Sequence, residues 1–67
     1  MEFTLKYKNL NEKRQIPYEN YTIENLLKDL KLSSQTTVSK QNGELVIEDT
    51  EICDGDEIQL IQIIYGG

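Results

Sequence analysis

Histidine and tryptophan are absent from the 67 residues of this chain, and cysteine occurs once, as Cys53. Without histidine the chain lacks the commonest general base and metal ligand, and it cannot form a Ser-His or Cys-His nucleophilic pair. A lone cysteine forms no internal disulfide and no cysteine-rich metal site. We therefore predict a protein that is not an enzyme, with no catalytic residue, no metal site and no permanently bound cofactor.

Long apolar runs and basic stripes are missing too. No stretch approaches the ~18 apolar residues of a membrane span, and Met1-Glu2-Phe3-Thr4 does not resemble a signal peptide. The chain has 12 acidic and 7 basic residues and a net charge of −5, whereas nucleic-acid binders carry a basic patch. We expect a cytoplasmic protein that binds neither membrane nor nucleic acid. The acidic balance favours a basic protein partner, although it also serves solubility.

The length allows one domain, which we place at residues 1–67 with a flexible tail over about 65–67. We expect this domain to be a monomer on its own. Because Phe3 is the only phenylalanine, aliphatic residues must supply the core. Leucine, isoleucine and valine recur along the whole chain, which excludes a disordered protein.

The first half predicts two strands and a helix. Residues 3–8 alternate apolar and polar side chains, as a half-buried strand does. Residues 9–12 carry turn chemistry, and 13–18 predict a returning strand at an edge, because it contains Pro17. The inward candidates on this returning strand are Ile16 and Tyr18.

A short amphipathic helix follows. Thr22 is a suitable N-cap, and Glu24 lies in the first turn, where the helix dipole favours a negative charge. The apolar residues fall on one helical face, and the helix is expected to end near Lys31. A helix of two to three turns is unstable alone, so it must pack on a sheet. Its apolar face consists of Ile23, Leu26, Leu27 and Leu30.

The second half predicts three strands. Residues 37–41 and 44–46 flank Asn42-Gly43, a pair that suits a two-residue type I′ turn because both positions need φ > 0. Residues 47–52 are irregular or form a short helical turn. After the turn Asp54-Gly55-Asp56, residues 57–64 form the most strand-like stretch of the chain.

The order β-β-α-β-β-β predicts an α+β fold of the β-grasp type. In this arrangement a mixed sheet of four to five strands curls over one main helix. We expect the last strand to lie in the centre, parallel to the first, because it is the most apolar.

Two polar features have structural interpretations. Asp54, Asp56 and Glu57 lack the further spaced oxygen ligands of a calcium loop, so we interpret them as a solvated turn, with contact to basic partner residues as the secondary interpretation. We interpret Cys53 as a small buried or half-buried hydrophobic residue in preference to a reactive thiol.

The last two residues are Gly66 and Gly67, which follow an apolar strand directly. A glycine end is often only a frayed end. Here, however, no charged residue follows Glu57, whereas a plain frayed end would usually be polar. Two residues without Cβ atoms can thread a narrow channel, and an ionised carboxylate is a competent nucleophile toward the α-phosphate of ATP. These properties favour a chemical role for the carboxylate of Gly67.

These segments together resemble the ubiquitin-like sulfur carriers of the ThiS/MoaD family. The resemblance covers the second half closely and the first half in pattern only. Within the family, the thiamine-pathway carriers are the closer match, because their apolar strand also runs straight into Gly-Gly and no proline follows Pro17 here. The matching segments are Asn42-Gly43-Glu44-Leu45-Val46, Asp54-Gly55-Asp56-Glu57-Ile58, Leu60-Ile61-Gln62-Ile63-Ile64 and Gly66-Gly67.

The resemblance implies a cycle in which an E1-like enzyme uses ATP to adenylate Gly67. A cysteine desulfurase or another persulfide donor then supplies sulfur, and a C-terminal thiocarboxylate passes it to a thiazole synthase or another acceptor. The segment between Val46 and Asp54 is shorter than in many relatives, and Cys53 precedes the Asp-Gly-Asp turn. The final acceptor, in thiamine, molybdopterin or tRNA thiolation, therefore stays open.

The strand before the tail predicts a docking surface. Ile58 and Leu60 share a face and belong to the core, whereas Ile61 and Ile63 point the other way. They form an exposed apolar patch for the activating enzyme, unless both faces of the strand are partly covered. We add Ile64 and Tyr65 to this docking set, although Tyr65 is equally well explained as an ordinary surface tyrosine.

Two other functions are compatible with the same sequence. A ubiquitin-like modifier would join the Gly67 carboxylate to target lysines through an isopeptide bond. A passive β-grasp binding module would end in glycine without using it.

Overall fold

The computed structural model describes residues 1–64, and its first two strands form a hairpin with a tight turn. Strand β1 spans Glu2–Tyr7 and β2 spans Leu10–Gln15, in antiparallel register from Glu2↔Gln15 to Tyr7↔Leu10. The turn predicted at 9–12 is therefore wrong. It lies at Lys8 and Asn9, with Lys8 at φ 54° in a conformation that usually marks glycine or asparagine.

Strand β2 carries almost no hydrophobic signal, which explains why its start was misplaced. Most of its side chains are exposed, so hydrogen bonds to β1 hold it in place more than burial does. It is an edge strand that ends just before Pro17, as that residue predicted. Ile16 packs against the core, but Tyr18 is exposed, so its inward placement is wrong.

Helix α1 spans Ile23–Asp29 and begins as predicted. The Thr22 hydroxyl accepts a hydrogen bond from the Asn25 N–H, and the Asn25 side chain accepts one from the Thr22 N–H, which together form a capping box. The helix ends two residues earlier than the expected end near Lys31. Lys31 has φ 60°, and the N–H groups of Lys31 and Leu32 donate to the carbonyls of Lys28 and Leu27 in a Schellman arrangement.

The hairpin predicted around Asn42-Gly43 is confirmed. Strand β3 spans Thr37–Gln41 and β4 spans Glu44–Val46, and the two turn residues have φ 53° and 87°. Residues 47–52 are irregular and contain a turn at Glu48-Asp49, so the helical alternative is wrong. Strand β5 spans Glu57–Gln62 and ends two residues earlier than predicted.

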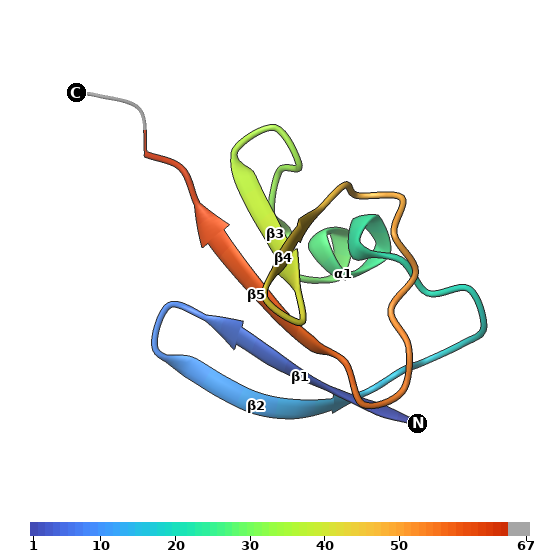
Figure 1. Ribbon diagram of the computed structural model, residues 1–67. Coiled ribbons are helices and arrows are strands. Elements are labelled where there is room, and N and C mark those ends of the chain that lie inside the picture. Colours follow the sequence, from blue (N-terminus) through green and yellow to red (C-terminus); the bar gives the residue numbers. More distant parts are fainter. Residues whose placement is uncertain (65–67) are drawn as a thin grey trace.

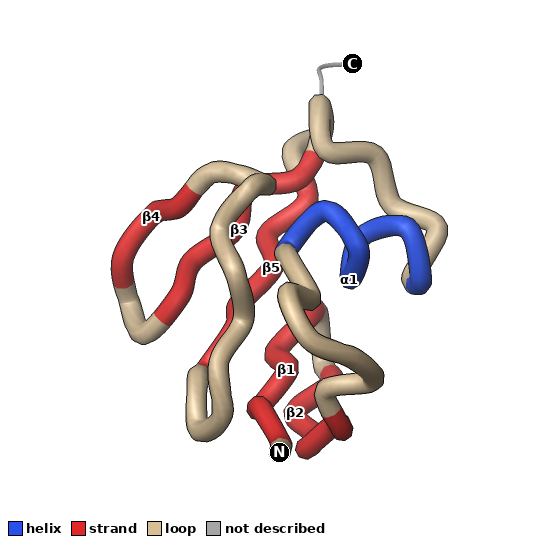
Figure 2. The backbone as a smooth tube through the Cα atoms, turned by 90° about the vertical axis from the view of Figure 1, so that its right-hand side faces the viewer, coloured by secondary structure: helices blue, strands red, loops and turns tan. Residues whose placement is uncertain are grey.

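The five strands form one mixed sheet in the order β2-β1-β5-β3-β4. Strand β5 lies in the centre, parallel to β1 and antiparallel to β3, as the sequence predicted. Figures 1 and 2 show the helix lying across one face of this sheet, while the other face carries no helix. The architecture is the α+β β-grasp fold with five strands and one helix in the described residues.

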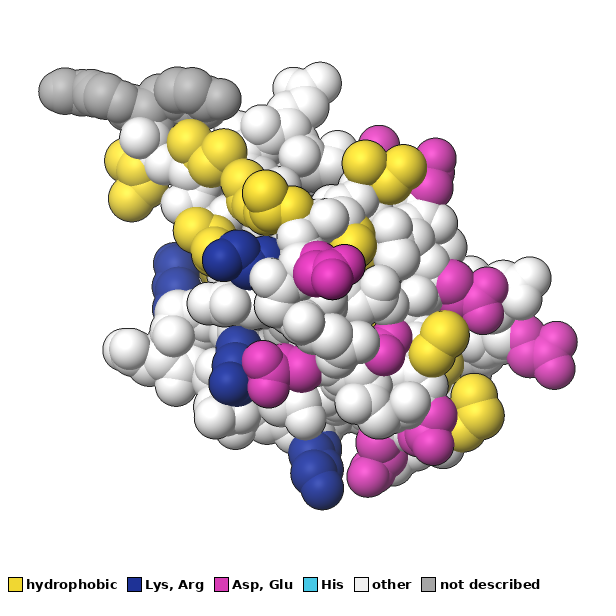
Figure 3. Space-filling view, in the orientation of Figure 1, with side chains coloured by type: hydrophobic (Ala, Val, Ile, Leu, Met, Phe, Trp, Pro, Cys, Tyr) yellow, Lys and Arg dark blue, Asp and Glu magenta, His cyan; other side chains and the backbone are white. Residues whose placement is uncertain are grey.

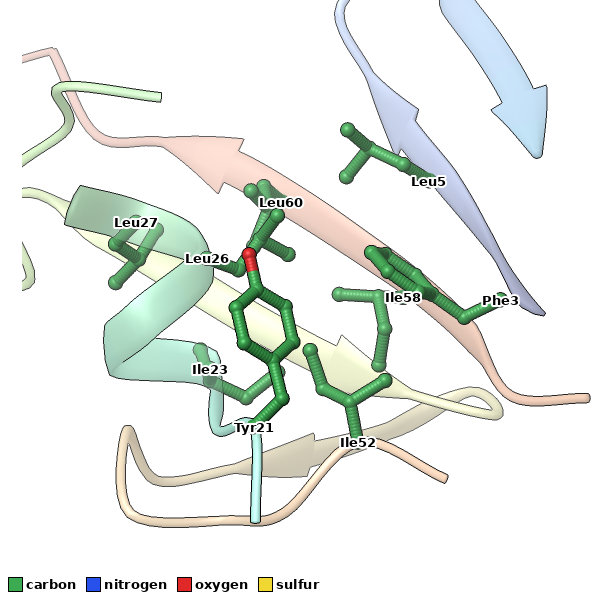
Figure 4. Close-up of a cluster of buried hydrophobic side chains, with 9 residues drawn as sticks. All are labelled: Phe3, Leu5, Tyr21, Ile23, Leu26, Leu27, Ile52, Ile58 and Leu60. Carbon is green, nitrogen blue, oxygen red and sulfur yellow. The ribbon is translucent and has the colours of Figure 1, made fainter. Parts of the chain in front are cut away.

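The core fills the space between the helix and the sheet (Figure 4). Tyr21, which the pattern of apolar residues did not predict, is among its members, and its hydroxyl donates a hydrogen bond to Asp29. Burial, together with this hydrogen bond, raises the pKa of Tyr21 well above its ordinary value. The nine core residues are Phe3, Leu5, Tyr21, Ile23, Leu26, Leu27, Ile52, Ile58 and Leu60.

Candidate functional site

The outer face of the sheet, opposite the helix, presents side chains in rows that cross the strands. One row pairs Lys6 of β1 with Gln59 of β5 and Gln59 with Lys40 of β3. The next row toward the C-terminus pairs Ile61 of β5 with Val38 of β3. Basic and apolar side chains therefore lie next to each other on the half of this face where β5 ends.

We name Val38, Ile61 and Ile63 the tail-side patch, because they lie where the chain leaves the sheet. Ile61 is 40% exposed and Ile63 39%, while Ile58 and Leu60 on the inner face are at 0% and 3%. The alternation predicted for this strand is confirmed, although more than half of the surface of each outer isoleucine is covered. Figure 3 shows hydrophobic side chains gathered toward the C-terminus with basic ones beside them.

The chain beyond β5 is held to the sheet for one more residue. The Ile63 N–H donates to the Thr36 carbonyl at 2.7 Å, which continues the register with β3. Ile64 is 89% exposed. The remaining predicted site residues, Tyr65, Gly66 and Gly67, lie outside the described residues.

A groove of about 370 Å³ runs beside the tail-side patch between the ends of β1 and β5. The Tyr7 hydroxyl donates to the Gln62 side chain at 3.3 Å, and the Lys8 ammonium lies 5.3 Å from the centre of the Tyr7 ring. Among the described residues that line this groove, none is acidic. The surface nearest the tail is thus apolar and basic, whereas the net charge of the chain is −5.

Glu57 partly neutralises the positive charge of this face. Its carboxylate lies 3.3 Å from the Lys6 ammonium, with both side chains nearly half exposed. A pair this exposed contributes little to stability. Lys40 and Lys8 form no ion pair within residues 1–64 and supply the positive charge beside the patch.

The Asn-Gly and Asp-Gly-Asp motifs, far apart in the sequence, bind each other. The Asp56 carboxylate accepts hydrogen bonds from the side chains of Gln41 and Asn42 at 2.7 and 3.0 Å, and from the Cys53 N–H at 2.7 Å. The Glu57 N–H donates to the Asn42 side chain at 2.9 Å. Asp56 is half-buried, so the interpretation of the whole group as a solvated turn is wrong for this residue.

These contacts also set the charge of Asp56. Burial alone would raise the pKa of its carboxyl, but the hydrogen bonds from Cys53, Asn42 and Gln41 outweigh it and hold that pKa below the ordinary value of 3.8. Since the bonds fasten the β3–β4 turn to the start of β5, Asp56 has a structural role that residue spacing alone did not reveal.

The remaining polar candidates have no such network. Cys53 is exposed, so its expected burial is wrong. Among residues 1–64, no group of three or more histidine, cysteine, aspartate or glutamate residues is arranged to hold a metal ion. Within the same part of the chain, every helix is too short to cross a bilayer.

Comparison with known proteins decides the family. The model of the ThiS family matches residues 2–67, almost the entire sequence. The chain belongs to the ThiS family. The resemblance inferred from its motifs is thereby confirmed, and the protein is not itself an enzyme, because ThiS-family proteins are small sulfur carriers that work with E1-like activating enzymes and sulfur donors.

Solved structures with the same fold agree with this assignment. SAMP1 from Haloferax volcanii superposes with a TM-score of 0.73 at 15% identity over 100% of both chains. The thiamine biosynthesis protein ThiS from Geobacter metallireducens gives 0.65 at 20% identity, covering 96% of this chain and 99% of that one. A ubiquitin-like protein from the hyperthermophilic archaea Caldiarchaeum subterraneum gives 0.64 at 22%, covering 98% and 100%. At these identities the likeness establishes the β-grasp fold alone.

Proposed function

We propose that this ThiS-family protein carries sulfur as a thiocarboxylate on Gly67 and delivers it to thiazole synthesis in thiamine biosynthesis. The observation that carries the proposal is the family match, which extends through Gly66 and Gly67. The 20% identical structure from Geobacter metallireducens is named as a thiamine biosynthesis protein, which favours this pathway over other acceptors.

The first step is activation by an E1-like enzyme. The Gly67 carboxylate attacks the α-phosphate of ATP, pyrophosphate leaves, and an acyl-adenylate forms. The terminal sulfur of a persulfide, carried by a cysteine desulfurase or another donor, then attacks the acyl carbon and displaces AMP, which gives an acyl disulfide. A thiol of the donor or of the activating enzyme cleaves this S–S bond, so that the thiocarboxylate is released and the thiol is oxidised to a disulfide. ATP is a substrate of the activating enzyme in this scheme, so the carrier itself needs no cofactor and no catalytic side chain. The absence of histidine from the sequence is compatible with this division of labour.

Docking of the activating enzyme is assigned to the end of β5. Ile61 and Ile63 provide partly exposed apolar surface, and the groove beside them is lined by residues at the ends of β1 and β5. Ile64 and Tyr65 complete this docking set, with Tyr65 as a contact immediately before the glycines. Two extended residues reach only ~7 Å, so the enzyme must grip the strand end to place Gly67 at the nucleotide.

Intact-mass spectrometry tests the proposal. After incubation with the cognate E1-like enzyme, ATP and a sulfur source, part of the carrier should become about 16 Da heavier, because sulfur replaces one carboxylate oxygen. A variant lacking Gly67 is the matched control and should keep its mass. If the full-length chain also keeps its mass, the sulfur-carrier proposal fails. Gly67-dependent conjugates of high mass in cell lysate would instead support the modifier function.

A further inference from the structure

The edge strand β4 pairs with only part of β3, and the course of the chain after β4 explains why. Pairing between β3 and β4 ends at Ser39↔Val46. Beyond that point the chain turns toward the helix, where the Glu48 and Thr50 carbonyls accept hydrogen bonds from the Glu24 and Ile23 N–H groups at 2.9 and 3.0 Å. The first N–H groups of a helix have no partner within it, so this segment satisfies them instead of extending β4.

Because the chain turns away after Val46, the start of β3 has no neighbouring strand along its edge opposite β5. The Thr36 carbonyl and the Asn42 N–H both bond to the β5 side, so the even-numbered residues of β3 face β5. Backbone groups alternate in direction along a strand, and those of Thr37 therefore point to the side that β4 has left. The Thr37 hydroxyl is also buried without a hydrogen-bond partner among the described residues. Within residues 1–64 this stretch is a strand edge with no pairing strand, and Thr37 is 9% exposed there.

A hollow of about 460 Å³ lies beside this edge. Its apolar wall comes from Leu27 of the helix and from Val46 and Ile47, and its polar wall includes Thr37 and Ser39. Ile47 is 71% exposed although it is a large aliphatic residue. A hollow with apolar walls next to an open strand edge fits an extended peptide, whose backbone pairs with the edge while one side chain fills the hollow.

The hollow carries negative charge. Glu48 is the one charged residue in its lining among the described residues, and the chain as a whole has a net charge of −5. The opposite holds beside the tail-side patch, where Lys8 and Lys40 lie. Charge complementarity therefore favours a different partner at each place, with a basic segment at the hollow.

We propose that the gap beside β3 binds an extended basic segment of a partner protein. The segment pairs with the free backbone edge at Thr37, places one aliphatic side chain against Leu27, Val46 and Ile47, and sets its lysine or arginine residues near Glu48. This interaction needs neither ATP nor the terminal glycines, so it is separate from sulfur transfer.

The test uses the capped peptide Lys-Val-Leu-Val-Lys as a probe in amide chemical-shift titrations of the full-length protein. We expect shifts confined to residues around the hollow, including Thr37 and Ser39, with a dissociation constant of about 0.1–1 mM, since a short peptide buries little surface. The matched peptide Glu-Val-Leu-Val-Glu should bind at least about fivefold more weakly. Equal binding of the two peptides, shifts elsewhere, or no shifts overturn the proposal.

Two pairs of variants locate the site. Ile47→Asp should weaken the lysine peptide at least about tenfold, whereas Leu45→Asp should not, because Leu45 is equally exposed at 69% but does not line the hollow. Glu48→Lys should weaken it about threefold or more, whereas Glu51→Lys, outside the lining, should have less effect. All four positions are exposed, so the fold should persist. If Ile47→Asp and Leu45→Asp behave alike, the assignment to this gap is wrong.

Discussion

The two faces of β5 carry the same type of residue in different surroundings. On the inner face, Ile58 is completely buried against the helix side of the sheet, while on the outer face Ile61, only three residues away, keeps 40% of its surface exposed. A fully buried aliphatic side chain stabilises the fold by about 1.5–3 kcal/mol, and a partly covered one contributes less. One six-residue strand thus supports the core with alternate residues and leaves the others partly exposed on the outer face.

The largest effect is expected on the inner face. Ile58→Ala should lower the free energy of unfolding by about 2–5 kcal/mol, because it leaves a cavity in a well-packed core. A domain of this size has a small stability margin, so unfolding by urea at low temperature is the appropriate measurement. Ile61→Ala is the matched control, with an expected loss below about 1 kcal/mol. Equal losses would show that the two faces do not differ in this way.

For adenylation by the E1-like enzyme, we expect substitutions on the outer face of β5 to have a large effect. Ile61→Asp should lower the kcat/KM for adenylation by the E1-like enzyme about 10- to 100-fold, mainly through KM, because a charge replaces apolar contact surface. Ile63→Asp should act in the same direction, and the circular dichroism of both should remain native. Ile47→Asp serves as the control, since Ile47 is even more exposed, at 71%, and follows the edge strand β4, away from the tail-side patch. Unchanged adenylation by Ile61→Asp would remove the tail-side patch from the docking surface.

A smaller effect on stability, which depends on pH, is expected from a substitution at the start of β5. Asp56→Asn should cost about 1–2 kcal/mol of stability, because a charged acceptor of three hydrogen bonds is lost. The folded-state pKa of Asp56 lies below its ordinary value of 3.8, so its contribution is complete above pH 3.8 and disappears as the pH falls through the folded-state pKa.

Thermal unfolding from neutral pH down to about pH 2 checks this prediction. The variant should lose less stability on acidification than the original protein. Asp54→Asn is the matched control, because Asp54 is exposed and accepts one backbone hydrogen bond, from the Glu2 N–H. An acid dependence that Asp56→Asn leaves unchanged would mean that another carboxyl group controls it.

The smallest effect concerns the ion pair on the outer face. Glu57→Gln should change stability by less than about 0.5 kcal/mol, since the Lys6–Glu57 pair is nearly half exposed. It also leaves Lys6 without its partner, so the face beside the tail becomes more basic. If an acidic rim on the activating enzyme contacts this face, association should become faster at low salt. A loss of stability above about 1 kcal/mol would show that the pair is structural after all.

Local signals in the sequence predicted some elements almost to the residue. Asn42-Gly43 specified the β3–β4 turn, and Thr22 specified the start of the helix, because each depends on neighbouring residues only. The start of β2 and the end of α1 were harder to predict, because each lies beside a lysine, Lys8 or Lys31, with a positive φ that glycine normally signals. The low hydrophobicity of β2 removed the other signal for its start.

The sequence by itself determined the alternation of β5, the central place of that strand and the family to which the chain belongs. Only the tertiary structure decided what surrounds those elements. It joined Asp56 to the Asn42 turn, set lysines beside the tail-side patch, and diverted the chain after Val46 to cap the helix, which opened the gap beside β3. The physical reason is that side-chain periodicity is local, whereas the partners of helix ends and sheet edges come from distant parts of the chain.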